Sequence, residues 1–256
     1  MNSATQYFVD KDSVVREIWG KSDTILFIFS GAAAEFALNK AVDWLYYTGK
    51  LPADPLGRLF STVTYARQIV FSELDAAHNA IDKITAIHSG VEKNRSAKIP
   101  DWAYRDVLFM LIHYSIASFE LLERKLSDHE KNDLYDVFLR MGNRMNLKGL
   151  PANYNDWTLS HEEHLQADLV KSDLTVDLFK QYRKHLGAFR YKLLLESQKL
   201  VVPYKVKLFL NFNNINWLSG VLWFYKLSRK LKLDGFLKSI ILPSKYKVEI
   251  KTLDKN

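Results

Sequence analysis

Two segments of the sequence are apolar on nearly every side and yet too short to cross a membrane. Residues 25–38 contain the small-residue run 31–34 and a single charged residue, Glu35, and the block VLFMLI occupies residues 107–112 of a second segment. A helix without a polar face has to be enclosed by other helices. Because a membrane span needs about 20 apolar residues, these two segments predict the centre of an all-helical globular protein.

The rest of the chain also follows the helical period. Asp54 and Pro55 have the residue types of a helix start, and Ser127 with Glu130 forms a capping-box pattern. Further helices are expected over residues 13–19, 43–47, 56–71, 74–87, 102–125, 127–146, 158–170 and 173–200, with 148–157 as a turn, and only 245–253 alternates like a strand. With no repeat and no linker, the sequence predicts one all-α domain over residues 1–256, a bundle of about ten helices.

The composition excludes several classes of chemistry. The sequence has no cysteine, which rules out disulfides, thiolate metal sites, thiol catalysis, covalently attached c-type haem and thiolate-ligated haem. The first twenty residues carry acidic side chains and no early apolar run, so a secretory signal is not expected. We therefore expect a cytoplasmic protein.

The positive charge is concentrated near the C-terminus. The chain has a net charge of +7, and residues 201–256 hold 11 of its Lys and Arg residues but only 3 acidic ones. Residues 215–242 mix aromatic and basic side chains, which suits either a core-packing helix with a basic outer face or an interfacial helix on anionic lipid. No nucleic-acid partner is expected, because the aromatic residues cluster with aliphatic ones instead of alternating with basic ones.

No familiar catalytic motif is present, so the candidate site rests on individual polar residues. The sequence lacks a Gly-rich phosphate loop, HExxH and a nucleophile elbow. HEEH at residues 161–164 lies in a very polar segment without a third ligand at useful spacing. We expect this segment to be solvated surface, since a structural metal site needs four ligands and a catalytic one at least three.

Two histidines fall on apolar helix faces. His88 follows Ile84 and Ile81 at helical spacing, and His113 comes directly after the block 107–112. A lone inward histidine is commonly a hydrogen-bonded core residue, but a neutral imidazole in an apolar wall also suits haem iron. For His113, a buried structural role and a place in the same cavity as His88 are both open.

Arg58 and Thr62 lie one turn apart at the start of the helix that Asp54 caps. One interpretation is an exposed polar stripe. The other is an anion site, because free N–H groups at a helix start favour negative charge and a guanidinium adds a bidentate clamp for a carboxylate or phosphate. The spacing alone does not choose between these interpretations.

The order of the segments resembles a known family. A buried Gly/Ala helix is followed by DPLGRLFST at 54–62, by ITAIHSGVE at 84–92 and by the long stretch IPDWAYRD…NYNDW at 99–157. From about Trp19 to Leu242, this succession resembles the all-helical oxygenases that include the rubber oxygenases (latex-clearing proteins) and the endoplasmic-reticulum oxygenase of mycophenolic acid biosynthesis.

The resemblance implies a b-type haem held non-covalently in a helical bundle. It places the proximal iron ligand at His88 and puts Arg58 and Thr62 around the haem, with Thr62 offering a hydrogen bond in the pocket. A recurrent family position falls on His113, which we expect to orient groups or shuttle protons. Ser61 stands where the rubber oxygenases carry a lysine.

These observations predict a haem b-dependent oxygenase that acts with O2 on an apolar substrate of isoprenoid, lipid or aromatic type. We expect Phe60, Phe109 and Met110 to wall the pocket, and a backbone or carboxylate partner to hold the second ring nitrogen of His88. Two alternatives remain: a non-catalytic helical protein that binds lipid, isoprenoid or haem, and a peripheral membrane protein that uses its basic C-terminal part from about residue 201.

Overall fold

The computed structural model describes residues 5–213 and 215–230, which form an all-helical structure without a β-strand. Its helices are α1 (Val14–Trp19), α2 (Ser22–Leu38), α3 (Val42–Tyr47), α4 (Lys50–Ala53), α5 (Pro55–Phe71), α6 (Leu74–Arg95), α7 (Asp101–Leu122), α8 (Asp128–Arg144), α9 (Tyr154–Ala167), α10 (Asp173–Val201), α11 (Tyr204–Phe209) and α12 (Leu218–Lys230). The predicted all-α fold is confirmed. The strand-like stretch 245–253 and residues 231–256 of the basic C-terminal part lie outside the described residues.

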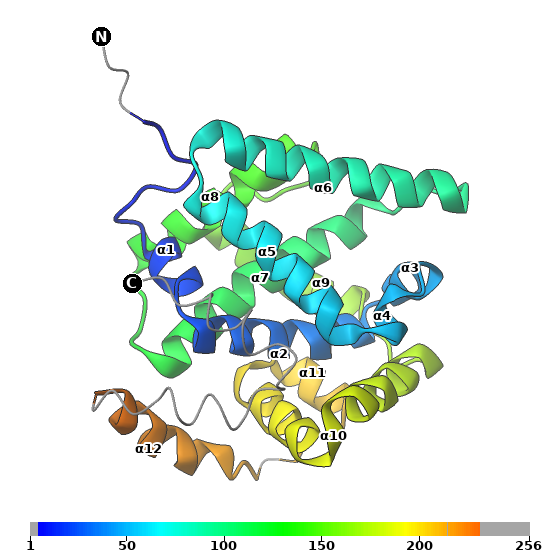
Figure 1. The fold of residues 1–256 in the computed structure, drawn as a ribbon, viewed down its shortest axis with the longest axis vertical. Helices are drawn as coiled ribbons and strands as arrows, with labels where there is room; N and C mark the ends of the chain where they lie inside the picture. Colours follow the sequence, from blue (N-terminus) through cyan, green and yellow to red (C-terminus); the bar gives the residue numbers. More distant parts are fainter. Residues whose placement is uncertain (1–4, 214, 231–256) are drawn as a thin grey trace.

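Helices α2 and α7 form the centre of the bundle, as their all-round apolar patterns predict. In Figure 1, α2 lies between α10 on one side and α5 and α7 on the other. Gly31 of α2 is buried against the ring of Tyr114 on α7, so that the two helices approach closely. No helix in the described part of the chain is both long enough and apolar enough to span a membrane.

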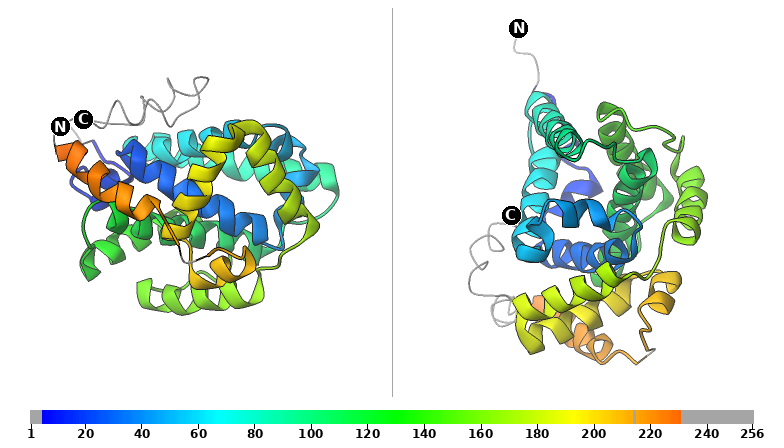
Figure 2. Two further views of the ribbon diagram at one scale, coloured as in Figure 1. Left: turned by 90° about the horizontal axis from the view of Figure 1, so that it is seen from below. Right: turned by 90° about the vertical axis from the view of Figure 1, so that its right-hand side faces the viewer.

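Helix α10 is broken at Gly187. The backbone there has φ 73° and ψ 168°, a conformation that is essentially restricted to glycine. Figure 2 shows the resulting bend. The half before the bend packs Leu178 and Tyr182 into a small second core with Ala37 and Val42, and the half after the bend returns along α2.

Helix α6 extends beyond its predicted end. The sequence predicts a stop before Gly90, but the helix continues to Arg95 and ends at Ser96, which has a left-handed φ of 53°. A single glycine destabilises a helix by only about 1 kcal/mol relative to alanine. A helix can therefore continue through a glycine where other contacts stabilise it. As a consequence, His88 lies inside a long helix and not at its frayed end.

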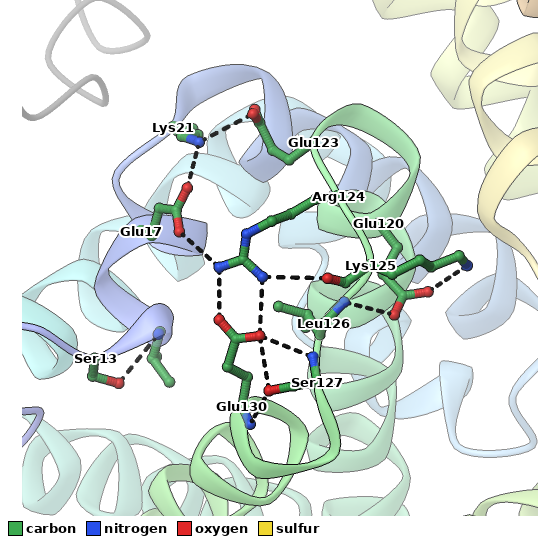
Figure 3. Close-up of polar contacts among 11 residues, drawn as sticks. Ser13, Glu17, Lys21, Glu120, Glu123, Arg124, Lys125, Leu126, Ser127 and Glu130 are labelled. Carbon is green, nitrogen blue, oxygen red and sulfur yellow. Dashed lines mark hydrogen bonds and ion pairs between the residues drawn. The ribbon is translucent and has the colours of Figure 1, made fainter.

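The corner between α7 and α8 carries the predicted capping box (Figure 3). Ser127 accepts a hydrogen bond from the backbone N–H of Glu130, and the Glu130 side chain accepts one from the backbone N–H of Ser127. Arg124 donates to both carboxylate oxygens of Glu130 at 2.6 and 2.9 Å. It also lies 3.6 Å from Glu17 of α1. The corner therefore ties the start of α8 to α1 by charge.

Candidate functional site

A large apolar cavity of about 1040 Å³ lies within the bundle. Its walls come from α2, α5, α6, α7, α10 and α12, and they include Ala33, Phe36, Met110 and Leu194. Ligand pockets in proteins have volumes of roughly 300–1,000 Å³, so this cavity is at the upper end of the range. It has room for a large ligand with an apolar surface.

Arg58 brings a positive charge to this cavity. Asp54 caps α5 by accepting a hydrogen bond from Gly57 N at 3.0 Å, and Arg58 follows in the first turn. Its Nη1 donates to Thr62 Oγ1 at 2.9 Å and to Ser61 Oγ at 3.3 Å, and all three side chains line the cavity. Arg58 forms no ion pair with a carboxylate of the described residues, and burial lowers its pKa. A partly buried cation in this situation favours an anionic ligand.

His88 also lines the cavity, from the middle of α6. Burial lowers the pKa of His88, and the charge of Arg58 lowers it further, so the imidazole is neutral at neutral pH. Its Nδ1 is buried and has no hydrogen-bond partner among the described residues. We expected a backbone or carboxylate group to bond one ring nitrogen of His88. In the described part of the chain, no such group bonds Nδ1. The ring packs edge-on against Tyr104 with centroids 5.2 Å apart.

Glu92, whose charge acts on His88, is a candidate for that missing partner, but it is engaged elsewhere. It lies one turn after His88 on α6 and accepts hydrogen bonds from Lys98 Nζ at 2.9 Å, Ile99 N at 3.0 Å and Tyr104 Oη at 3.3 Å. These bonds hold Tyr104 beside the imidazole. His88 is therefore positioned by packing against a fixed tyrosine ring.

The remaining predicted site residues are divided among different places. Met110 lines the large cavity, as expected. Phe109 does not line it and packs edge-on against Trp157 with centroids 6.4 Å apart. The side chain of Phe60 lies outside the described part of the structure. His113 does not share the cavity with His88, because it lines a separate cavity of about 340 Å³.

The expectation of a solvated HEEH segment is wrong. His161 and His164 are 7% and 4% exposed, because α9 turns Trp157, His161 and His164 toward the core at i, i+4 and i+7. The ring of His161 stacks between Trp157 at 5.2 Å and His113 at 4.8 Å. Burial, reinforced by the charge of His113, lowers the pKa of His161 to about 3. Burial also lowers the pKa of His113 itself.

His164 forms the centre of a buried polar cluster that the sequence did not predict. Its Nε2 lies 3.0 Å from Glu35 Oε1, and its Nδ1 lies 3.0 Å from Asp106 Oδ1 and 3.7 Å from Asp168 Oδ2. Tyr114 donates to the other oxygen of Glu35 at 2.7 Å. Burial acts to lower the pKa of His164, but the carboxylates of Asp106 and Glu35 outweigh it and raise the pKa to about 9. Burial acts to raise the pKa of Glu35, but His164 outweighs it and the pKa is lowered.

One sequence signal could have found this cluster. Glu35 is the only charge in the apolar stretch 25–38, and an unpaired buried carboxylate is too costly to persist. Glu35 therefore needs a buried partner that is cationic or donates a hydrogen bond, and few residue types can supply one. The sequence does not say which partner it is, because His164 is 129 residues away.

The fold and the site define an all-helical protein built around a large apolar cavity, into which a neutral imidazole and a guanidinium project. The chain belongs to the family described as ER-bound oxygenase mpaB/B'/rubber oxygenase, catalytic domain, whose family model matches residues 19–210. The family resemblance predicted from the sequence is thereby confirmed. Neither a search of the curated proteins nor a search of the solved structures gives a significant match.

Proposed function

We propose that this chain is a haem b-dependent oxygenase that acts with O2 on an apolar substrate. The observation that carries the proposal is the large apolar cavity, which brings His88, with a buried and unpartnered Nδ1, together with Arg58, which has no carboxylate partner among the described residues. Membership in a family of oxygenase catalytic domains supports the oxidative part of the proposal.

The residues of the cavity fit a haem by their chemistry. When bound, haem b supplies an iron that binds and activates O2. His88 would hold that iron through a ring nitrogen, because its imidazole stays neutral. Arg58 would pair with a propionate, since guanidinium and carboxylate bind in a bidentate manner.

The cavity walls determine which substrates can enter. Apolar side chains on α2, α7 and α10 exclude water and favour an isoprenoid, lipid or aromatic substrate. Thr62 donates its hydroxyl proton to the backbone carbonyl of Arg58 at 3.1 Å, so it offers a hydrogen bond to a bound group only after this proton turns. Ser61, at the position of the rubber-oxygenase lysine, removes a cation from the cavity wall. We therefore do not extend the rubber-cleaving specificity to this chain.

His113 takes a more distant part in this proposal. It lies on the smaller cavity next to His161, and so it does not touch a ligand in the large cavity. A role in proton transfer would require a path through α7. The proposal gives His113 that indirect role and no contact with substrate.

Absorption spectra of the purified protein test the haem assignment. We expect hemin added to the haem-free protein to give a Soret band at one equivalent, and we expect His88→Ala to lose or strongly shift that band. His185→Ala is a suitable control, because His185 is exposed on α10. Wild-type protein that takes up no hemin would overturn the proposal, and in that case saturable binding of a fatty acid or isoprenoid would identify a non-catalytic carrier of apolar ligands.

We also propose that the basic C-terminal part contacts anionic membranes. Tyr204 and Leu208 on α11 and Ile215 after it are largely exposed, and lysines lie beside them at 205 and 207. Vesicle flotation tests this contact. The double variant Tyr204→Ser/Leu208→Ser should bind phosphatidylserine vesicles more weakly, and Val176→Ser, an exposed apolar position on α10, serves as its control. Equal binding by both variants would contradict the contact.

A further inference from the structure

The buried cluster around His164 has the geometry of a metal site. Three side chains converge there: Asp106 from α7, His164 from α9 and Asp168 directly after α9. One potential ligand atom from each lies within 4.8 Å of the other two. In a site with metal–ligand distances of about 2.0–2.2 Å, neighbouring ligand atoms are about 3–4 Å apart. The distances of 3.0 and 3.7 Å from His164 Nδ1 to the two aspartates fit this spacing.

The nitrogen that would bind the metal lacks a proper hydrogen bond. The side chain of His164 is 2% exposed, and its Nδ1 points toward Asp106 but has no hydrogen-bond partner of acceptable geometry among the described residues. The opposite nitrogen, Nε2, lies 3.0 Å from Glu35 Oε1. In its neutral form, a histidine that is held by a carboxylate at one nitrogen presents the lone pair of the other, which is the usual arrangement of histidine ligands, and metal binding would release the second ring proton.

Asp106 is oriented in the same way. Asn39 donates a hydrogen bond to Asp106 Oδ2 at 2.8 Å, which leaves Oδ1 directed at His164. Glu35 is itself fixed by the hydroxyl of Tyr114. Two of the three potential ligands therefore have a buried partner that sets their orientation, as metal ligands usually do.

The charges of the cluster favour a cation. Glu35, Asp106 and Asp168 bring three carboxylates to one imidazole, and Glu35 and Asp106 are buried. A buried carboxylate needs a cationic partner. A divalent ion between His164, Asp106 and Asp168 would supply two positive charges at the point where the ligand atoms meet.

We propose that His164, Asp106 and Asp168 bind a divalent first-row transition-metal ion such as Zn²⁺. One imidazole nitrogen and two carboxylate oxygens suit such an ion, whereas Ca²⁺ prefers six to eight oxygen ligands. Asp168 is the most exposed of the three, with 22% of its side chain accessible, so the ion enters from its side. None of these residues lines the large cavity, and the site is independent of the proposed haem.

Metal analysis of tag-free, full-length protein tests the site. After treatment with chelator and dialysis, we expect wild-type protein to take up one equivalent of Zn²⁺, and Co²⁺ to give visible d–d absorption. Asp168→Asn should weaken Zn²⁺ binding at least tenfold. Glu163→Gln, an exposed position on α9, should bind Zn²⁺ as wild type does. Elemental analysis counts zinc separately from iron, so the result does not depend on haem.

Two outcomes would overturn the metal site. One is wild-type protein that binds no Zn²⁺ at micromolar free concentration, which would identify His164 as an imidazolium ion paired with its carboxylates. The other is unchanged Zn²⁺ affinity in Asp168→Asn. Because Asp168 is partly exposed, this variant tests the site even if His164→Gln fails to fold. Zn²⁺ should also raise the unfolding temperature of wild type and leave that of Asp168→Ala unchanged.

Discussion

Replacing Gly31 by alanine should test the close approach of α2 and α7. A Cβ atom at Gly31 would lie closer than 3.0 Å to Cδ1 and Cε1 of Tyr114. The Tyr114 ring has no room to move, because it is 0% exposed and its hydroxyl is bonded to Glu35. The extra methyl group must therefore separate the helices or displace the ring.

Both responses cost stability. Overpacking a core costs about 1–3 kcal/mol. Displacing the ring would also weaken the Tyr114–Glu35 hydrogen bond, and a bond to a charged group contributes about 1.5–3 kcal/mol. Separation of the helices alone therefore predicts a loss of about 1–3 kcal/mol, and displacement of the ring a loss of roughly 3–5 kcal/mol. In a chain of this size each kcal/mol lowers Tm by about 2–4 °C, so we expect Tm to fall by about 10 °C.

Gly90→Ala provides a control in which we expect stability to rise instead of fall. Gly90 is inside α6, and a Cβ there meets no atom within 4 Å. Alanine favours a helix by about 1 kcal/mol over glycine, so this variant should be slightly more stable than wild type. Thermal and urea unfolding, followed by circular dichroism, measure both changes. A Gly31→Ala protein as stable as wild type would refute the close packing of α2 on Tyr114.

Variants at three other positions test charges. Arg58→Gln should weaken hemin binding by about 10–100-fold, which corresponds to the loss of one charge-assisted pair, and Arg58→Lys should lose less; a hemin titration measures both. The pKa of His161 is about 3, below its usual 6.5. Between these values the unfolded chain binds a proton that the folded one does not, so stability falls as pH drops below 6.5, by up to about 1.4 kcal/mol per pH unit. His161→Gln should flatten this fall in urea unfolding at pH 6.5, 5.5 and 4.5, and an unchanged slope would assign the fall to another group. The pKa of Glu130 is lowered to about 2 by Arg124 and Ser127. Its stabilisation is present above the usual 4.5 and lost as pH falls toward 2, so Glu130→Gln should cost about 1 kcal/mol at pH 7 after solvent screening and nothing near pH 2, as measured by thermal unfolding.

Local sequence signals predicted the starts of α5 and α8 correctly. Asp54 caps α5 and Ser127 caps α8 with the expected side-chain bonds, because a cap depends only on residues three positions apart. The inward face of α6 was also predicted well enough to place His88 on the cavity wall. The end of α6 was not, because the chain beyond Gly90 is held in the helix by contacts such as Glu92 with Lys98 and Tyr104.

The buried cluster could not be predicted from local pattern. Residues 161–164 look polar in sequence, and His164 is buried only because Glu35 and Asp106 arrive from α2 and α7. The same limit applies to His113. The helical period predicted that its side chain faces inward, but it did not predict that the side chain lines the smaller cavity. Periodicity gives the face of a helix, whereas the partner of that face depends on tertiary structure.

The large cavity and the buried cluster share two helices. On α2, Ala33 and Phe36 line the cavity, and Glu35 between them points to His164 on α9. On α7, Met110 lines the cavity and Asp106 one turn earlier belongs to the cluster. Gly31 of α2 packs against the ring of Tyr114 on α7, and the hydroxyl of Tyr114 bonds Glu35, so one helix pair carries both the cavity wall and the buried cluster.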